Sequence, residues 1–157
     1  MPNTTKPLVG HAALRRHRVS LPGHVYHITT TTRERRRYFD DFLSARAAVR
    51  ALNSHEALGG SEPLAWVLMP DHLHMLVQLA EHAELPALMN RLKAATARSV
   101  NRQLGRSGPV WQQSFHDHLL RKEEDLKAVA RYIVMNPLRA GLVKRISEYP
   151  HWDAAWL

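Results

Sequence analysis

Two histidines separated by a single residue are the first feature of this sequence that can do chemistry. They are His72 and His74, in the run HLHMLVQL. Alternate side chains of a β-strand point to opposite faces, so both imidazoles project from one face and can share a cation. The sequence holds no cysteine, so the other ligands of a metal ion would be histidine, carboxylate or amide groups. Two polar residues on a half-exposed strand are the alternative interpretation.

A tyrosine and an asparagine four residues apart form a second candidate pair. On a helix, Tyr132 and Asn136 would lie one above the other on the same side. Four other apolar residues can fill the buried stripe of this helix: Leu126, Val129, Ile133 and Val134. Tyr132 then lies at the margin, with a hydroxyl that needs a polar neighbour. The alternative interpretation is an interfacial tyrosine and a helix-ending asparagine without a chemical role.

The charge of the chain favours a polyanion as its partner. Lys and Arg number 22 against 14 Asp and Glu, which gives a formal net charge of +8. Nucleic acid is the first candidate, and a membrane surface or simple solubility are the others. No stretch approaches the ~20 apolar residues of a membrane span, and the N-terminus has no uninterrupted apolar region of a secretion signal. Together with the absence of cysteine, this predicts a cytoplasmic protein without a membrane span, associated with the nucleoid if DNA is its partner.

The chain length suits a single domain preceded by a short arm. Residues 1–21 lack hydrophobic periodicity and carry three arginines: Arg15, Arg16 and Arg18. We expect them to form a basic arm that orders on docking or on binding, ahead of one folded domain over residues 22–157.

Hydrophobic patterning predicts four strands and three helices within this domain. The strands are expected at about 24–32, 64–69, 72–79 and 115–121, and the helices at about 42–57, 85–104 and 123–136. This βαββαβα order predicts an α+β, ferredoxin-like fold, with the helices packed on one face of an antiparallel sheet.

Three ordered segments carry a resemblance to a known family. MPDHLHMLVQL, VWQQSFHDHLLR and ARYIVMNPLRAGLV resemble the IS200-like tyrosine transposases of the HUH class, most closely their REP-associated branch. The resemblance extends to PGHVYHIT and to the Tyr149 and Trp152 region. It implies that His72 and His74 are metal ligands and that Tyr132 is the nucleophile. The family completes its metal site with a polar side chain one turn after the tyrosine, which implies Asn136.

The resemblance implies an endonuclease and transposase that cleaves and rejoins single-stranded DNA next to hairpins. A phenol with the usual pKa near ~10 is a poor nucleophile, so it requires positioning and a polarised target. A hard divalent ion, Mg²⁺ or Mn²⁺, would supply the polarisation. The expected product is a 5′-phosphotyrosine with a free 3′-hydroxyl, and attack by another 3′-hydroxyl would join strands. REP-associated relatives favour a monomer, with a dimer as the alternative.

If the helices cover one face of the sheet, the other face is left for DNA. We expect Trp111 to stack on a base. Eight arginines are expected to contact phosphates: Arg33, Arg35, Arg36, Arg37, Arg91, Arg98, Arg121 and Arg139. The basic arm would read a single-stranded guide sequence at the foot of the hairpin. Strand histidines such as His27 and His118 are expected to be hydrogen-bonded within the fold.

Two other functions remain open from the sequence. One is a non-catalytic module that binds single-stranded nucleic acid, because ferredoxin-like sheets commonly do so. The other is a metal-dependent nuclease that uses water as its nucleophile, in which Tyr132 would only orient the substrate.

Overall fold

A computed structural model describes residues 23–121 and 124–156, and in it five strands form one antiparallel sheet. The strands lie in the order β4-β1-β3-β2-β5. Their bounds are Val25–Thr31 (β1), Glu62–Met69 (β2), His72–Gln78 (β3), His116–Leu119 (β4) and Trp152–Ala154 (β5). Because β1 and β2 both pair with β3 rather than with each other, this is the predicted split βαβ arrangement. The α+β class and the antiparallel sheet are confirmed, and β5 is an additional strand.

Helices lie between the strands of the described part of the chain, except between β2 and β3, which a turn joins. The α-helices are Phe42–Leu52 (α2), His55–Leu58 (α3), Leu85–Leu104 (α4), Leu126–Val134 (α5) and Asn136–Arg139 (α6). Short 3₁₀ helices cover Arg33–Arg35 (η1), Tyr38–Asp40 (η2) and Ile146–Glu148 (η3). No helix among the described residues is long and apolar enough to cross a membrane.

Local signals explain where the main helices begin and end. The carboxylates of Asp41 and Asp125 accept hydrogen bonds from backbone N–H groups in the first turns of α2 and α5, which satisfies donors that the helices leave unpaired. Gly105 ends α4 in a left-handed conformation, with φ of 61°. The backbone between α5 and α6 departs from the helix at Met135, just before Asn136 and Pro137.

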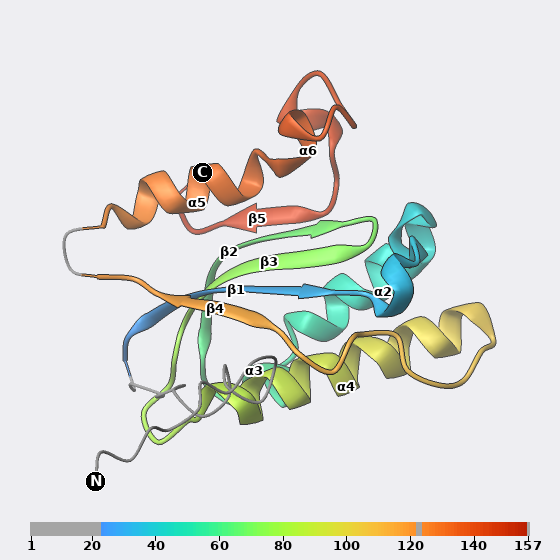
Figure 1. Ribbon diagram of the computed structural model, residues 1–157, viewed down its shortest axis with the longest axis horizontal. Coiled ribbons are helices and arrows are strands. Elements are labelled where there is room, and N and C mark those ends of the chain that lie inside the picture. Colours follow the sequence, from blue (N-terminus) through green and yellow to red (C-terminus); the bar gives the residue numbers. More distant parts are fainter. Residues whose placement is uncertain (1–22, 122–123, 157) are drawn as a thin grey trace, which may run out of the picture.

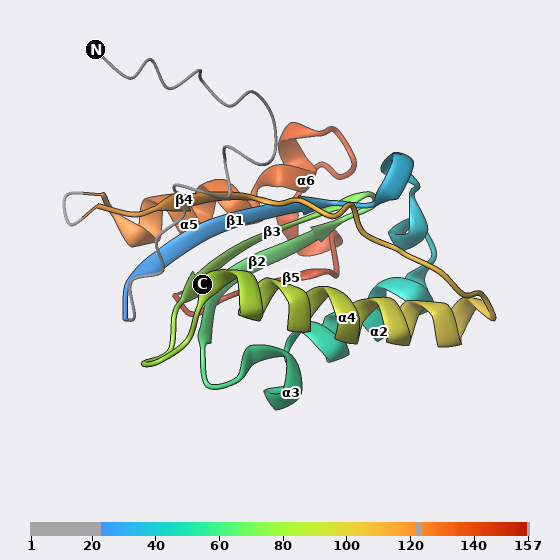
Figure 2. The same cartoon turned by 60° about the horizontal axis from the view of Figure 1, so that its bottom comes forward.

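One face of the sheet packs against α2, α3 and α4. Ile28, Trp66, Leu68, Met75 and Val77 point to this face and form one buried cluster with the apolar sides of these helices. Figures 1 and 2 show the three helices together on that side of the sheet. This cluster is the larger core of the protein.

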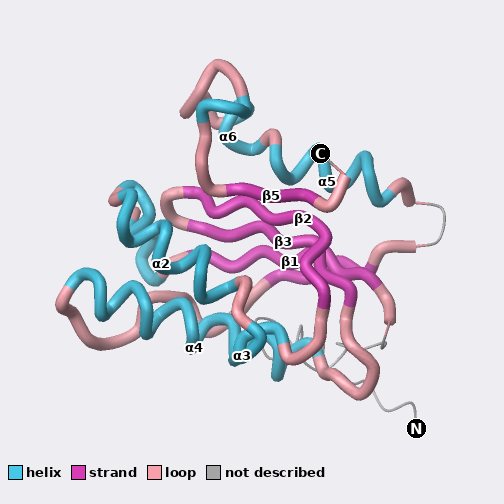
Figure 3. Tube along the Cα trace, turned by 180° about the vertical axis from the view of Figure 1, so that it is seen from behind, coloured by secondary structure: helices cyan, strands magenta, loops and turns pink. Residues whose placement is uncertain are grey.

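The opposite face is covered in part by α5, which corrects the expectation that all helices lie on one face. Ala65, Val67 and Leu76 point to this second face and pack against Ile133 and Val134 of α5 in a separate, smaller cluster. Figure 3 shows α5 running along the β5 side of the sheet, away from α2 and α4. The physical reason is the continuous apolar run in β2, which makes both faces of that strand hydrophobic, so both need cover.

Candidate metal and tyrosine site

His72 and His74 lie on β3 and point to the face that carries α5. They alternate along the strand with the core residues Leu73 and Met75, and Leu76, which shares their face, packs in the cluster with α5. Their ring centroids are 5.0 Å apart at an interplanar angle of 82°. The predicted pair of imidazoles on one face is therefore present in the fold.

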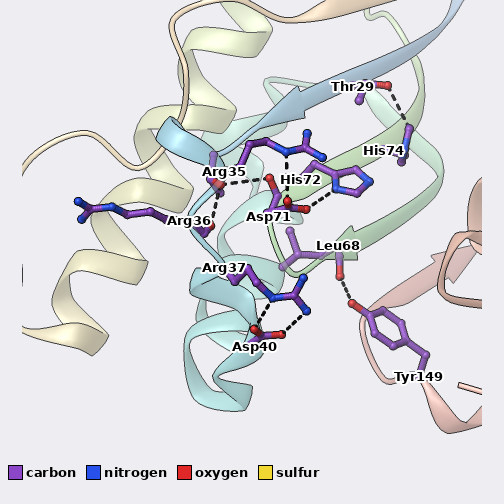
Figure 4. A network of polar contacts seen from close by, with 11 residues as sticks. Thr29, Arg35, Arg36, Arg37, Asp40, Leu68, Asp71, His72, His74 and Tyr149 are labelled. Atoms are coloured by element: carbon purple, nitrogen blue, oxygen red, sulfur yellow. Dashed lines mark hydrogen bonds and ion pairs between the residues drawn. The ribbon is translucent and has the colours of Figure 1, made fainter. Parts of the chain in front are cut away.

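A carboxylate orients His72. The Nδ1 atom of His72 lies 2.7 Å from Oδ1 of Asp71, in the turn between β2 and β3. The Nε atom of Arg35 lies 3.1 Å from the other oxygen of the same carboxylate, as Figure 4 shows. A carboxylate on one ring nitrogen fixes the tautomer and leaves the second nitrogen as a metal ligand. Sequence reasoning did not single out Asp71 for this role.

Two side chains of β1 hold His74. Its Nδ1 atom lies 3.0 Å from Oγ1 of Thr29 and 3.1 Å from Nε2 of His27. Burial lowers the pKa of His74 to about 3, and the charges of His72, His27 and Arg139 act in the same direction. His74 is therefore neutral at physiological pH, as a metal-ligating imidazole must be.

The donor set fits a hard divalent ion that keeps open positions. In both histidines Nδ1 is engaged, so Nε2 is the nitrogen that remains for a metal. Asn136 donates from Nδ2 to the carbonyl of Ile133 at 2.8 Å, which leaves its Oδ1 atom as the acceptor. Within residues 23–121 and 124–156, no three histidine, aspartate or glutamate residues gather into a metal site. Two imidazoles and one amide oxygen would leave further positions for substrate oxygens.

Tyr132 lies on the outer side of α5, with 60% of its surface exposed. The guanidinium carbon of Arg139 sits 3.8 Å from the centroid of its ring, and the same group donates a hydrogen bond to the carbonyl of Tyr132. The charge of Arg139 also reaches His74, where it contributes to the lowered pKa. Arg139 therefore contacts Tyr132, and among the described residues no hydrogen bond or ring contact joins Tyr132 to either histidine directly.

The arginine cluster after β1 lies at the same end of the sheet as His72. Thr31, the last residue of β1, is paired with His72. The four exposed arginines that follow are held by acidic neighbours or remain free to reach outward: Arg33, Arg35, Arg36 and Arg37. Arg37 pairs with Asp40 at 2.7 Å. The cluster therefore begins at the end of the sheet where His72 lies.

The remaining predicted DNA contacts are spread over the molecule. Arg91 and Arg98 lie on α4, which covers the face opposite to the histidines, and Arg98 pairs with Glu56. Arg121 is exposed just after β4. The arm residues Arg15, Arg16 and Arg18 lie outside the described residues. The fold thus brings Arg35 to Asp71 beside His72 and Arg139 to Tyr132, and it leaves Arg91 and Arg98 on the other side of the sheet.

Trp111 requires a correction. It is 6% exposed and belongs to the core under α4, where its indole nitrogen donates to Oγ1 of Thr96 at 2.8 Å. The centroid of its ring lies 5.5 Å from that of Phe39, so Trp111 is not available to stack on a base. The expectation for the strand histidines is confirmed for His27, which contacts His74, and for His118, which lies 3.0 Å from Glu124.

Comparison with known proteins places the chain in a family. Residues 20–136 match the family described as "Transposase IS200 like". The chain is 30% identical over 141 residues to a protein of Haemophilus influenzae assigned as a REP-associated tyrosine transposase, covering 82% of this chain and 78% of that protein. It is 28% identical over 96 residues to the REP-associated tyrosine transposase of Escherichia coli, covering 58% of this chain and 55% of that one.

Solved structures share the fold. A REP-associated tyrosine transposase bound to a REP hairpin superposes with a TM-score of 0.68 at 24% identity, covering 87% of this chain and 79% of that chain. A transposase from Deinococcus radiodurans superposes with a TM-score of 0.55 at 22% identity, covering 76% and 94%. The chain belongs to the IS200-like transposase family. Within it, the chain falls in the branch of REP-associated tyrosine transposases, which implies a DNA endonuclease or transposase activity.

Proposed function

We propose that the protein cleaves and rejoins single-stranded DNA next to hairpins, with Tyr132 as nucleophile. His72, His74 and Asn136 would hold a divalent metal, Mg²⁺ or Mn²⁺. One observation carries the proposal. The helix that bears Tyr132 packs on the same sheet face to which His72 and His74 point, although the two elements are far apart in the sequence.

The proposed reaction exchanges one phosphodiester for another. The Oη atom of Tyr132 attacks the scissile phosphorus, the bond from phosphorus to O3′ breaks, and the departing oxygen takes up a proton as the phenol loses one. The product is a 5′-phosphotyrosine and a free 3′-hydroxyl. A second 3′-hydroxyl reverses the step on a new strand, and no ATP is required because the number of phosphoester bonds stays the same. A bound divalent ion would draw electron density from the phosphorus.

The protein side chains position these groups. The two imidazoles are held through their Nδ1 atoms by Asp71, Thr29 and His27. Their rings are therefore already oriented when substrate arrives and do not have to reorganise. Arg139 holds the ring of Tyr132 and brings a positive charge beside it. That charge can meet the phosphate as the bond to tyrosine forms.

A DNA hairpin is the proposed partner. The structural relative with the TM-score of 0.68 is described as bound to a REP hairpin, and the net charge of +8 suits a polyanion. We propose that the chain acts as a monomer, that residues 1–21 read the guide sequence, and that residues 22–157 form the nuclease domain. Such a substrate would place the protein at the nucleoid.

A trapping experiment tests the nucleophile. Labelled single-stranded DNA with a stem-loop is incubated with the protein and Mn²⁺, denatured, and separated by electrophoresis. We expect an adduct that survives denaturation with the wild type and none with Tyr132→Phe. Because the side chain is largely exposed, the variant should unfold at nearly the wild-type temperature.

Each other outcome has a defined meaning. Cleavage without an adduct would show a nuclease that uses water, and binding with neither product would show a non-catalytic module. An adduct formed by Tyr132→Phe would rule out Tyr132. The double variant His72→Ala with His74→Ala should lose Mn²⁺-dependent cleavage, and full activity of this variant would overturn the metal assignment.

A further inference from the structure

A hollow of about 210 Å³ shares the η1 turn with the candidate site. Arg33 and Arg36 line it from this turn, and Arg106 lines it from the loop between α4 and β4. Figure 4 shows Arg35 pointing toward Asp71 and His72, whereas Arg36 points away from them. One turn therefore presents arginines both to the histidine pair and to a separate hollow.

Arg106 is a fixed cation without a charged partner among the described residues. Its guanidinium donates to Oδ1 of Asn101 and to the carbonyl of Pro109, and its guanidinium carbon lies 4.9 Å from the centroid of the Tyr38 ring. These contacts are all neutral, so they orient the group and leave its charge uncompensated. An oriented arginine loses less conformational entropy when an anion binds.

The backbone of the η1 turn is strained at Glu34 and Arg35. Glu34 and Arg35 have φ values of 58° and 55°, in the left-handed region that is unfavourable for residues with a Cβ. The fully buried Thr32 fastens the turn through its hydroxyl, 2.7 Å from the carbonyl of Arg36. The backbone N–H of Arg33 donates to the carbonyl of Val110 at 2.8 Å, which ties the turn to the loop that bears Arg106. Such strain persists where the surroundings hold it, and it concentrates at functional sites.

The carboxylate in this hollow is a weak competitor for an incoming anion. Glu34 pairs with Arg36 at 3.3 Å, and both side chains are more than half exposed. Exposed ion pairs of this kind are weak, because solvent screens the two charges. Within the described part of the chain, no ion pair engages the guanidinium of Arg33. The hollow thus offers three arginine side chains of which only one is neutralised, and that one weakly.

We propose that this hollow binds a backbone phosphate of the DNA strand that passes through the candidate site. Arg106 would act as the preset contact, and Arg33 and Arg36 would close around the phosphate, using the forked geometry that suits its oxygens. The inference rests on the proposed function and deepens it, because it names a second point at which the substrate strand is held. It also assigns a role to Arg106, which the sequence did not single out.

Salt-dependent binding of the same stem-loop oligonucleotide, with Mn²⁺ absent, tests this site. Each phosphate contact to a single strand contributes about 0.7 to the slope of log affinity against log salt. We expect Arg106→Met to lower that slope by about 0.7 and to weaken binding about tenfold at low salt. Arg102→Met is the matched control, because it removes the same charge from the exposed side of α4 and should leave both values unchanged. Glu34→Gln should tighten binding, because it removes the competing carboxylate.

The outcomes separate this site from the proposed nucleophile. If Arg106→Met binds as tightly as Arg102→Met with an equal salt slope, the phosphate site is wrong, even when the wild type forms an adduct. If Arg106→Met loses affinity but the wild type forms no adduct, the phosphate site stands and the proposed nucleophile fails. Weaker binding by Glu34→Gln would also count against the site, since the carboxylate would then be part of the contact.

Discussion

The two faces of the sheet are built from the same strands but differ in their side chains. On the side of α2 and α4, Leu73, Met75 and Val77 of β3 are at most 2% exposed and belong to a continuous core. On the side of α5, His72 and His74, which alternate with these residues along β3, stay partly exposed. The difference arises because α5 packs against β2, β3 and β5, while polar residues of β1 such as Thr29 occupy the rest of that face.

This contrast separates stability from chemistry at the level of single residues. Neighbours on β3 alternate between a well-packed core and a polar surface, so a change at one position should affect folding and a change at the next should affect activity. The candidate site lies at the border of the part that α5 covers. Substitutions on the two faces therefore offer a direct way to test whether the division holds.

The largest effect is expected from His74→Ala on the α5 face. Loss of one imidazole removes a proposed metal ligand, so Mn²⁺-dependent cleavage should fall by at least about 100-fold. Chemical denaturation should show a much smaller loss of unfolding free energy, about 1 kcal/mol. Wild-type cleavage by this variant, or a loss of stability that explains its inactivity, would contradict the division between the faces.

Met75→Ala is the matching change on the opposite face. Removing a fully buried side chain leaves a cavity in the core, so the free energy of unfolding should fall by about 2–5 kcal/mol. Adduct formation per folded molecule should stay at the wild-type level, measured at a temperature where the variant remains folded. A large drop in adduct yield at full folding would show that the core face contributes to the chemistry.

Asp71→Ala tests the support of His72 and should have a smaller effect. Without the carboxylate, the Nδ1 atom of His72 loses its partner, and Mn²⁺ affinity measured by titration should fall by about 10–100-fold. Asp71→Asn retains an acceptor oxygen and should fall between this variant and the wild type. Equal metal affinity in all three proteins would show that His72 needs no such support.

The smallest expected effect is a pH dependence of the free energy of unfolding that arises from histidines on the α5 face. His74 has a pKa lowered to about 3 by burial and by neighbouring charges, and the pKa of His27 is lowered chiefly by burial. The unfolded chain takes up a proton on the imidazole of His74 near pH ~6.5 while the folded His74 stays neutral, so its contribution to stability is complete above that pH and decreases as the pH falls below it. Between pH ~7 and ~5.5, His74 alone should account for about 1 kcal/mol.

Urea denaturation at the two pH values measures this change, and His74→Ala should show a flatter dependence. His151 is also buried with a lowered pKa, but it is present in both proteins and cancels in the difference. Identical pH dependence in the variant would mean that His74 does not carry the effect.

The sequence predicts the order of elements because this order depends on local patterns. The family resemblance, not a local pattern, singles out His72, His74 and Tyr132, and their roles stay predictions. Strict alternation in HLHMLVQL separates core residues from the histidines, and the observed strand begins at His72 as expected. The prediction that α5 packs on the same face as the other helices was wrong, although the sequence contains a signal for its true position. The run LAWVLM is apolar at consecutive positions, and Leu76 interrupts the polar side of β3, so both indicate a second covered face.

Other features depend on contacts between distant segments. Trp111 was expected at the surface, but a bridge to Thr32 and the hydroxyl of Thr96 hold it in the core. The support of His74 by Thr29 and His27 follows from the pairing of β1 with β3, which no local pattern specifies. The role proposed for Arg106 likewise depends on a contact between distant segments, because the η1 turn meets the loop after α4.

The two outer strands of the described sheet bear on how the protein behaves when it is concentrated. β4 has four residues and β5 has three, so each outer edge offers only a few unpaired N–H and C=O groups. Short edges give another chain little length along which to pair, and this limits growth into aggregates through added strands. A high concentration of the protein should therefore not drive its copies to join edge to edge.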